Sequence, residues 1–100
     1  MKLQVALDLL STDDAVNLLN DIAPYVDIIE VGTPLIKIEG LAVLREIKSR
    51  WPDKFLFADL KTMDAGALEA ELALNAGADA VSVLAVAADG TIAGAVNAAN

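Results

Sequence analysis

Residues 55–61 of this chain read Phe-Leu-Phe-Ala-Asp-Leu-Lys, an apolar run that leads directly into two charged side chains. Three more apolar runs of similar length occur at Leu3–Leu7, Val26–Val31 and Ala80–Leu84. Nearly continuous apolar runs of this length are typical of strands that are buried on both faces, as in parallel sheets. The four runs, with Phe55–Ala58 as the third, therefore predict four strands of one parallel sheet.

Helical patterns occupy the segments between these runs. The first begins at the capping residues Ser11–Asp14, and the others cover Leu41–Arg50, residues 65–76, and the chain from Asp89 onward. Strands that alternate with helices in this way indicate an α/β fold with right-handed crossovers. We therefore expect residues 1–100 to form four consecutive βα units within a single domain.

The second pair of units weakly repeats the first. Asp8 and Asp13 align with Asp59 and Asp64 at a constant offset of 51 residues. A repeat of this kind indicates that two similar supersecondary units stack side by side in one sheet.

The chain carries 7 basic and 15 acidic side chains, a formal net charge of −8, and it contains neither Cys nor His. Without these two residue types, the chain cannot supply a disulfide framework, a thiolate nucleophile or an imidazole base. The acidic balance argues against nucleic-acid binding, because few basic groups are available to neutralise phosphates. No apolar run approaches the roughly 20 residues of a membrane span. We therefore expect a cytoplasmic protein with no membrane partner.

Three of the predicted strands carry an acidic residue at or near their carboxyl end: Asp8, Glu30 and Asp59. In a parallel sheet these ends lie at one edge, where α/β proteins place their active sites. Converging carboxylates repel one another unless a divalent cation or an ammonium group offsets their charge. Lys61, expected on the loop after Asp59, is the basic residue in position to do this. The alternative is that Asp8 and Asp59 are polar strand ends or helix caps.

Other polar positions have structural interpretations. Asp13 and Asp14 are expected in the first turn of a helix, where a negative charge interacts favourably with the helix dipole. Asp27 is expected to be a solvated residue at the start of a strand. The segment Gly32-Thr33-Pro34 is expected to form a tight loop, with a ligand cradle as the alternative.

Residues 59–66 read Asp-Leu-Lys-Thr-Met-Asp-Ala-Gly and contain the D-x-K-x-x-D pattern of the orotidine 5′-monophosphate decarboxylase superfamily. Together with residues 3–8 and 26–34, this segment resembles the 3-hexulose-6-phosphate synthase family. The resemblance extends over essentially the whole chain. The sequence of residues 61–66 is more similar to that of the synthases than to that of the sister family, the 3-keto-L-gulonate-6-phosphate decarboxylases.

This resemblance implies that the chain is the N-terminal half of a TIM (β/α)8 barrel that forms a homodimer and uses Mg2+. By analogy, Glu30 and Asp59 would be the metal ligands, and Lys61 would stabilise an anion formed from a sugar-phosphate substrate. Asp8 would be a catalytic and substrate-binding residue that orients Lys61 and the substrate. Asp64 would be a catalytic residue that reaches into the active site of the partner subunit.

The implied activity is that of a Mg2+-dependent aldol lyase of the ribulose monophosphate pathway. Such an enzyme condenses formaldehyde with ribulose 5-phosphate to give 3-hexulose 6-phosphate. The first alternative is 3-keto-L-gulonate-6-phosphate decarboxylase activity. The second is a non-catalytic half-barrel that associates with itself. In the family, the phosphate-binding loops belong to the second half of the barrel, so we expect this half to pair with another half-barrel.

Overall fold

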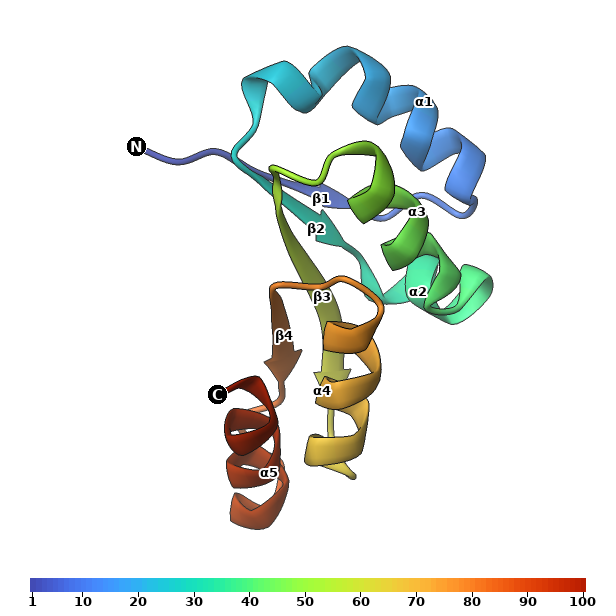
Figure 1. Cartoon of the computed structure of the whole chain (residues 1–100). Helices are drawn as coiled ribbons and strands as arrows, with labels where there is room; N and C mark the ends of the chain where they lie inside the picture. The colour runs from blue at the N-terminus through green and yellow to red at the C-terminus, as the bar shows by residue number, and fades with distance from the viewer.

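The computed structural model describes all residues from Met1 to Asn100. Its four strands form one parallel sheet in the order β1-β2-β3-β4. The strands are β1 (Gln4–Leu7), β2 (Ile28–Val31), β3 (Phe55–Thr62) and β4 (Ala80–Val83). Figure 1 shows them with helices between successive strands. The predicted α/β class and the parallel order of the strands are therefore confirmed.

The helices form the crossovers between the strands. They are α1 (Thr12–Ile22), a short 3-10 turn η1 (Ala23–Tyr25), α2 (Thr33–Glu39), α3 (Ala42–Arg50), α4 (Gly66–Asn75) and α5 (Asp89–Ala99). None of these helices combines the length and the apolar character that a membrane crossing requires.

The crossover between β2 and β3 contains two helices where the sequence predicted one. The expectation of a tight loop at residues 32–34 was wrong, because α2 begins there with Pro34 in its first turn. A proline is well suited to that position, since its missing N–H has no partner within the helix and its φ angle is already helical. Gly40, with a φ angle of 67°, ends α2 and lets the chain turn into α3.

The hydrophobic core lies between the sheet and its helices. Alternate strand residues point into it, and the fully or almost fully buried large side chains are Leu7, Leu19, Ile29, Val31, Leu35, Val43, Leu44, Ile47 and Leu56. Residues on the other face of the sheet remain partly open, and Phe55 there is 44% exposed. The two outer strands, β1 and β4, each have one unpaired edge. This agrees with the exposed inner face and open edges expected of half a barrel.

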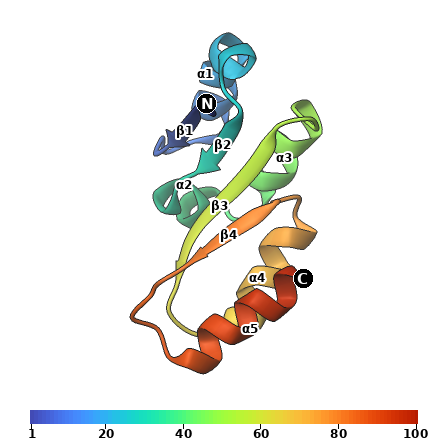
Figure 2. The ribbon, with the colours of Figure 1, turned by 90° about the vertical axis from the view of Figure 1, so that its left-hand side faces the viewer.

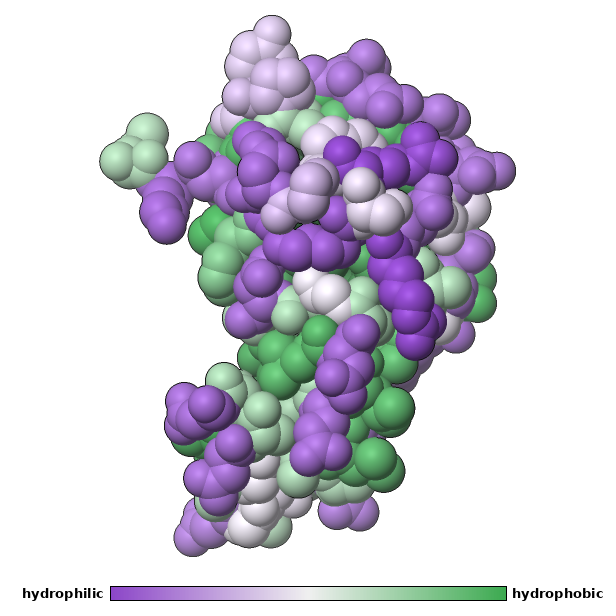
Figure 3. All heavy atoms as spheres, viewed as in Figure 1, coloured by the Kyte–Doolittle hydropathy of each residue, from purple (hydrophilic) through white to green (hydrophobic).

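Helix α5 packs along α4, as the second view in Figure 2 shows. Their contact is close because both helices present glycines. A Cβ at Gly66 would collide with the backbone carbonyl of Thr91, and one at Gly94 would come within 3.1 Å of the Ala67 nitrogen. Ala95 is the residue of α5 that is buried. Figure 3 shows hydrophobic residues gathered over this half of the molecule, where the α4 side chains Leu68 and Leu72 are 57% and 48% exposed.

Two aspartates join the beginnings of neighbouring strands in the same way. The Asp27 carboxylate accepts a hydrogen bond from the Leu3 N–H at 2.7 Å, and the Asp79 carboxylate accepts one from the Leu56 N–H at 2.8 Å. In return, the backbone N–H of Asp27 donates to the Leu3 carbonyl at 2.9 Å, and that of Asp79 donates to the Leu56 carbonyl at 2.7 Å. Asp27 is exposed just before β2, as predicted, and its hydrogen bonds to Leu3 give it a structural role in addition. Asp79 makes the same pair of contacts one pair of units later.

Asp79 has a second partner, the Lys48 ammonium at 2.8 Å. Burial by itself raises the pKa of Asp79, but the hydrogen bonds from Lys48 and Leu56 and the Lys48 charge outweigh it and lower the pKa below 3.8. Because the folded-state pKa is depressed, this carboxylate stabilises the fold above the pKa of the unfolded chain. The contribution is lost as the pH falls through the lower folded value.

Substituting Asp79→Ala should lower the free energy of unfolding by about 1–2 kcal/mol near neutral pH, because the buried Leu56 N–H loses its side-chain acceptor. Urea unfolding followed by circular dichroism measures this change. Asp53→Ala, at an exposed residue, is the control and should change the stability by less than about 0.5 kcal/mol. The effect of Asp79→Ala should shrink near pH 3, and an equal loss at both pH values would contradict this role of the carboxylate.

Candidate active site

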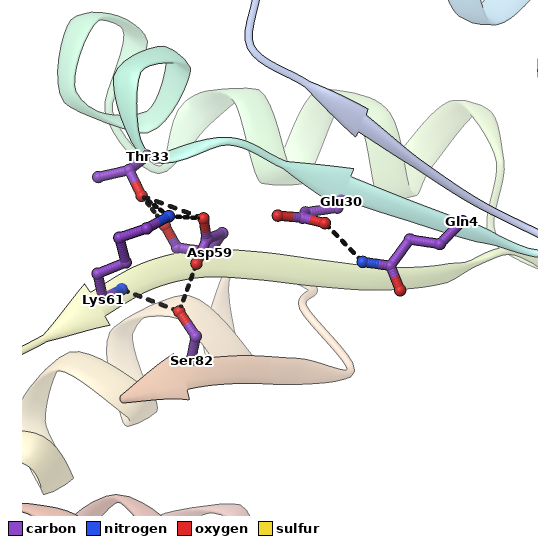
Figure 4. Close-up of polar contacts among 6 residues, drawn as sticks. All are labelled: Gln4, Glu30, Thr33, Asp59, Lys61 and Ser82. Atoms are coloured by element: carbon purple, nitrogen blue, oxygen red, sulfur yellow. Dashed lines mark hydrogen bonds and ion pairs between the residues drawn. The ribbon is translucent and has the colours of Figure 1, made fainter. Parts of the chain in front are cut away.

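Asp59 lies at the centre of a polar cluster on the open face of the sheet, and its side chain is only 13% exposed. One carboxylate oxygen, Oδ1, accepts a hydrogen bond from the Ser82 hydroxyl at 2.6 Å. The other, Oδ2, forms an ion pair with the Lys61 ammonium and lies 3.4 Å from the Thr33 hydroxyl. Figure 4 shows that the partners of Asp59 come from three separate segments of the chain.

Thr33 adds two further contacts. Its hydroxyl donates to the backbone carbonyl of Asp59 and accepts a hydrogen bond from the Lys61 ammonium at 3.1 Å. Thr33 is the first residue of α2, so the helix that the sequence did not predict positions this side chain. The cluster therefore joins the beginning of α2 to β3 and β4.

Lys61 lies within β3, not on a loop after it, so that prediction was wrong. Ala58 pairs with Val81 and Thr62 pairs with Val83, which leaves residues 59–61 of β3 opposite Ser82 alone. This bulge places Lys61 in the left-handed conformation, with a φ angle of 50°. Bulges occur preferentially beside active sites, where they redirect a side chain. A non-glycine residue with positive φ is strained and persists only where the surroundings enforce it.

The charges in this cluster support one another. Burial by itself raises the pKa of Asp59, but hydrogen bonds from Lys61, Ser82 and Thr33 and the Lys61 charge lower it below 3.8. The hydrogen bond to Asp59 raises the pKa of Lys61 above 10.5, and the charges of Asp59, Glu30 and Asp8 add to this effect against the opposing effect of burial. Both groups of the ion pair are therefore fully charged at neutral pH.

Glu30 lies on β2, the strand beside β3, and pairs in register with Phe57. Its carboxylate accepts a hydrogen bond from the Gln4 amide of β1 at 2.5 Å, as Figure 4 shows. Glu30 makes no direct contact with Asp59 or Lys61, yet its charge contributes to the raised pKa of Lys61. The charges of Asp8, Glu30 and Asp59 thus all act on the Lys61 ammonium.

Asp8 follows β1 and is exposed. It shares no hydrogen bond with Lys61, so its influence on the ammonium is through its charge. The space for its carboxylate comes from Gly32, because a Cβ at Gly32 would collide with Asp8 Oδ1 and would lie 2.7 Å from the Leu7 carbonyl. Gly32 is therefore required by close approach, since its own φ angle of −67° is accessible to any residue.

Asp64 lies outside the cluster. Its carboxylate accepts a hydrogen bond from the Ala65 N–H at 2.7 Å, and Ala65 adopts the left-handed conformation just before α4. Asp64 lines a shallow hollow of about 510 Å³ between the beginnings of α4 and α5. Within this chain, the D-x-K-x-x-D pattern thus brings its first two charged residues together and directs the third elsewhere.

The donor set is compatible with Mg2+. No group of three or more carboxylates lies close enough to hold a metal ion. Magnesium, however, is commonly bound by only one or two carboxylates, and water and substrate oxygens complete its octahedron. Glu30 and Asp59 provide two such carboxylates on adjacent strands, both directed to the open face of the sheet.

Ser82 is a cluster residue that the sequence analysis did not identify, and Thr33 entered that analysis only within the segment 32–34, for which a ligand cradle was the alternative. Ser82 is the only polar residue in the run Ala80–Leu84, and that interruption was an available signal. The contacts of Thr33 could not be predicted, because its position depends on α2 beginning at the end of β2.

The profile of the orotidine 5′-phosphate decarboxylase / HUMPS family matches residues 1–100. The chain belongs to this family. Within the family, it is 64% identical to the 3-hexulose-6-phosphate synthase of Mycobacterium gastri. The alignment spans 99 residues, which are 99% of this chain and 48% of that protein. The resemblance seen in the sequence is therefore confirmed.

Solved structures of the family agree. A crystal structure of 3-hexulose-6-phosphate synthase matches with a TM-score of 0.97 and 65% identity, over 99% of this chain and 48% of that one. The 3-keto-L-gulonate-6-phosphate decarboxylase of Vibrio cholerae O1 biovar El Tor matches with a TM-score of 0.96 and 40% identity, over 98% of this chain and 46% of that one. The chain spans about half the length of these relatives and has the fold of half a TIM barrel.

Gly32→Ala should disturb the site by forcing the Asp8 carboxylate and the Leu7 backbone apart. We expect it to lower the free energy of unfolding by about 1–3 kcal/mol, the cost of overpacking a tight contact. Thermal unfolding measures the change. Gly90→Ala is the matched control: its Cβ would meet nothing within 4 Å and it lies in α5, so it should be neutral or stabilising by up to about 1 kcal/mol. Equal effects of the two substitutions would contradict the close approach.

Proposed function

We propose that this chain is the metal- and lysine-bearing half of a 3-hexulose-6-phosphate synthase, an aldol lyase that joins formaldehyde to ribulose 5-phosphate. The observation that carries the proposal is the Asp59–Lys61 ion pair beside Glu30, on the open face of a half-barrel that belongs to this family. Sequence identity favours the synthase, because the synthase match is 64% identical and the decarboxylase match is 40% identical.

The reaction requires stabilisation of an anion. C1 of ribulose 5-phosphate loses a proton, and the electron pair left behind forms an enediolate with C2. Carbon C1 then attacks the carbon of formaldehyde, one carbon–carbon bond forms, and the formaldehyde oxygen gains a proton to become a hydroxyl group. The proton lost and the proton gained balance, so no oxidant or reductant is needed.

Lys61 is suited to stabilising that negative charge. Its pKa lies above the ordinary value of 10.5, so the side chain, already an ammonium ion at neutral pH, serves as a fixed positive charge and not as a base. The Lys61 side chain is 54% exposed, on the face of the sheet that substrate would approach. A preorganised cation directed at developing negative charge is among the largest contributions to enzymatic rate acceleration.

Glu30 and Asp59 are the residues that we propose hold Mg2+. A bound divalent cation supplies Lewis acidity toward the oxygens of a sugar substrate. Asp59 remains ionised down to low pH because of its hydrogen bonds, and an ionised carboxylate is the form that binds a metal. Asp8, at the end of β1, would orient Lys61 and the substrate through its charge.

We further propose a homodimer in which Asp64 acts in the site of the partner subunit. Its exposure and its position away from the Asp59–Lys61 pair support this role, because it has no place in the cluster of its own chain. Pairing of the open edges of β1 and β4 with a second half-barrel belongs to the same proposal, as do a sugar-phosphate substrate and a cytoplasmic location.

The test of the activity is a chimera in which this chain replaces the matching segment of the Mycobacterium gastri synthase. We expect consumption of formaldehyde that depends on both ribulose 5-phosphate and Mg2+. Release of CO2 from 3-keto-L-gulonate 6-phosphate instead would assign the decarboxylase function, and a folded chimera with neither activity would overturn the proposal. In the active chimera, Asp59→Asn should lower turnover at least about 100-fold. Asp53→Asn, at an exposed position, is the control and should leave turnover unchanged.

Mixed dimers test the role of Asp64. Chimeras carrying Asp64→Ala or Asp59→Asn should each be inactive alone. When co-expressed, they should regain part of the activity, because one site of each mixed dimer then contains both native side chains. If mixing restores no activity although mixed dimers form, Asp64 does not act across the subunit boundary.

A further inference from the structure

Ser82 interrupts an otherwise apolar edge strand. Strand β4 reads Ala-Val-Ser-Val, and its valines at 81 and 83 pair with Ala58 and Thr62 of β3. Between these two paired positions, β3 contains three residues and β4 contains only Ser82. Ser82 therefore lies opposite the bulge that carries the two charged residues of the site.

The Ser82 hydroxyl bonds to both ends of that bulge, as Figure 4 shows. It donates to the Asp59 carboxylate at 2.6 Å and accepts from the Lys61 backbone N–H at 2.9 Å. A serine hydroxyl can act as donor and acceptor at the same time, whereas an alanine or valine can do neither. One side chain thus connects the carboxylate of one site residue to the backbone of the other.

We propose that Ser82 is a positioning residue, whose hydroxyl holds the bulge so that Asp59 and Lys61 both face the site. The effect of Ser82 on catalysis rests on the proposed function. Its effect on the conformation of residues 59–61 rests on the two hydrogen bonds and on the left-handed conformation of Lys61.

The physical reason lies in the backbone of Lys61. A positive φ angle costs a non-glycine residue about 1–3 kcal/mol, so the conformation needs an interaction that compensates. In a regular parallel ladder, the N–H of each paired residue would donate to a backbone carbonyl of the neighbouring strand. The bulge removes that option at Lys61, and the Ser82 hydroxyl takes the place of the missing carbonyl.

The sheet itself does not depend on this hydroxyl. Beyond the bulge, the Leu84 N–H donates to the Thr62 carbonyl at 2.9 Å, and before it Ala58 still pairs with Val81. Removing the hydroxyl should therefore loosen residues 59–61 and leave the pairing on both sides intact. That separation distinguishes a positioning role from a general role in stability.

The test compares three variants of the chain by amide hydrogen exchange, measured with two-dimensional NMR. Ser82→Ala removes the hydroxyl, Ser82→Thr keeps it, and Ser49→Ala removes a serine hydroxyl on α3 whose only bond is to the Glu46 carbonyl. In Ser82→Ala, the Lys61 amide should exchange about tenfold faster, which corresponds to the loss of one hydrogen bond. The Leu84 amide should be unchanged, and Ser82→Thr and Ser49→Ala should both match the native chain.

Three outcomes would overturn the proposal: an unchanged Lys61 exchange rate in Ser82→Ala, equal acceleration of Lys61 and Leu84, or failure of Ser82→Thr to restore the native rate. In the chimera, the same Ser82→Ala change should lower kcat with little change in KM. A chimera that is inactive with its native Ser82 would count against the proposed function alone, because the exchange experiment does not depend on turnover.

Discussion

The ion pair between Asp59 and Lys61 is the interaction on which the rest of this site depends. Asp59 is a largely buried carboxylate on a strand face that it shares with Phe55 and Phe57, and burial alone would favour its neutral form. The ammonium and two hydroxyl donors reverse that preference and keep it ionised. In turn, the hydrogen bond to Asp59 and the charges of Asp59, Glu30 and Asp8 raise the pKa of Lys61. The largely buried carboxylate is therefore tolerated because the ammonium and the two hydroxyls are present, and the pair places both signs of charge on one face of the sheet.

Two backbone features make this arrangement possible, and both lie where neighbouring chain segments approach closely. The bulge in β3 inserts residues opposite Ser82 and rotates Lys61 into the left-handed region. Gly32, at the beginning of α2, leaves the space that the Asp8 carboxylate occupies. Neither feature depends on residue type alone. The bulge arises where β3 pairs with β4, and the close approach at Gly32 arises where the beginning of α2 meets the end of β1. The packing of the backbone segments therefore determines where the side chains of the site lie.

This distinction explains what the sequence could predict. The apolar runs, the helical periodicity and the alternation of the two depend on local pattern, and they predicted the α/β class and the parallel sheet. Helix α2 was missed because Pro34 resembles a loop residue until its place in the first helical turn is known. The position of Lys61 within β3 was missed because the apolar run stops at Ala58, while strand pairing with β4 continues to Thr62. The local sequence marks Ser82 as a polar interruption and Thr33 as part of a possible cradle, but their partners at Asp59 and Lys61 depend on tertiary hydrogen bonds.

The two ends of the sheet use acidic residues for opposite purposes. At the amino ends of β2 and β4, Asp27 and Asp79 each exchange two hydrogen bonds with the backbone of the preceding strand, and so fix the register of a strand pair. At the carboxyl ends of β1 and β3, Asp8 and Asp59 leave the ladder and direct their charge toward Lys61. The acids at the amino ends thus fix the register, and those at the carboxyl ends remain available for chemistry. This division is expected of a TIM barrel, in which stability and chemistry belong to opposite faces. The repeat supplies an aspartate at both kinds of position in each pair of units, so one supersecondary pattern serves both purposes. The second copy differs from the first in its bulge at residues 59–61 and in Lys61, which takes the position that Leu10 occupies in the first copy.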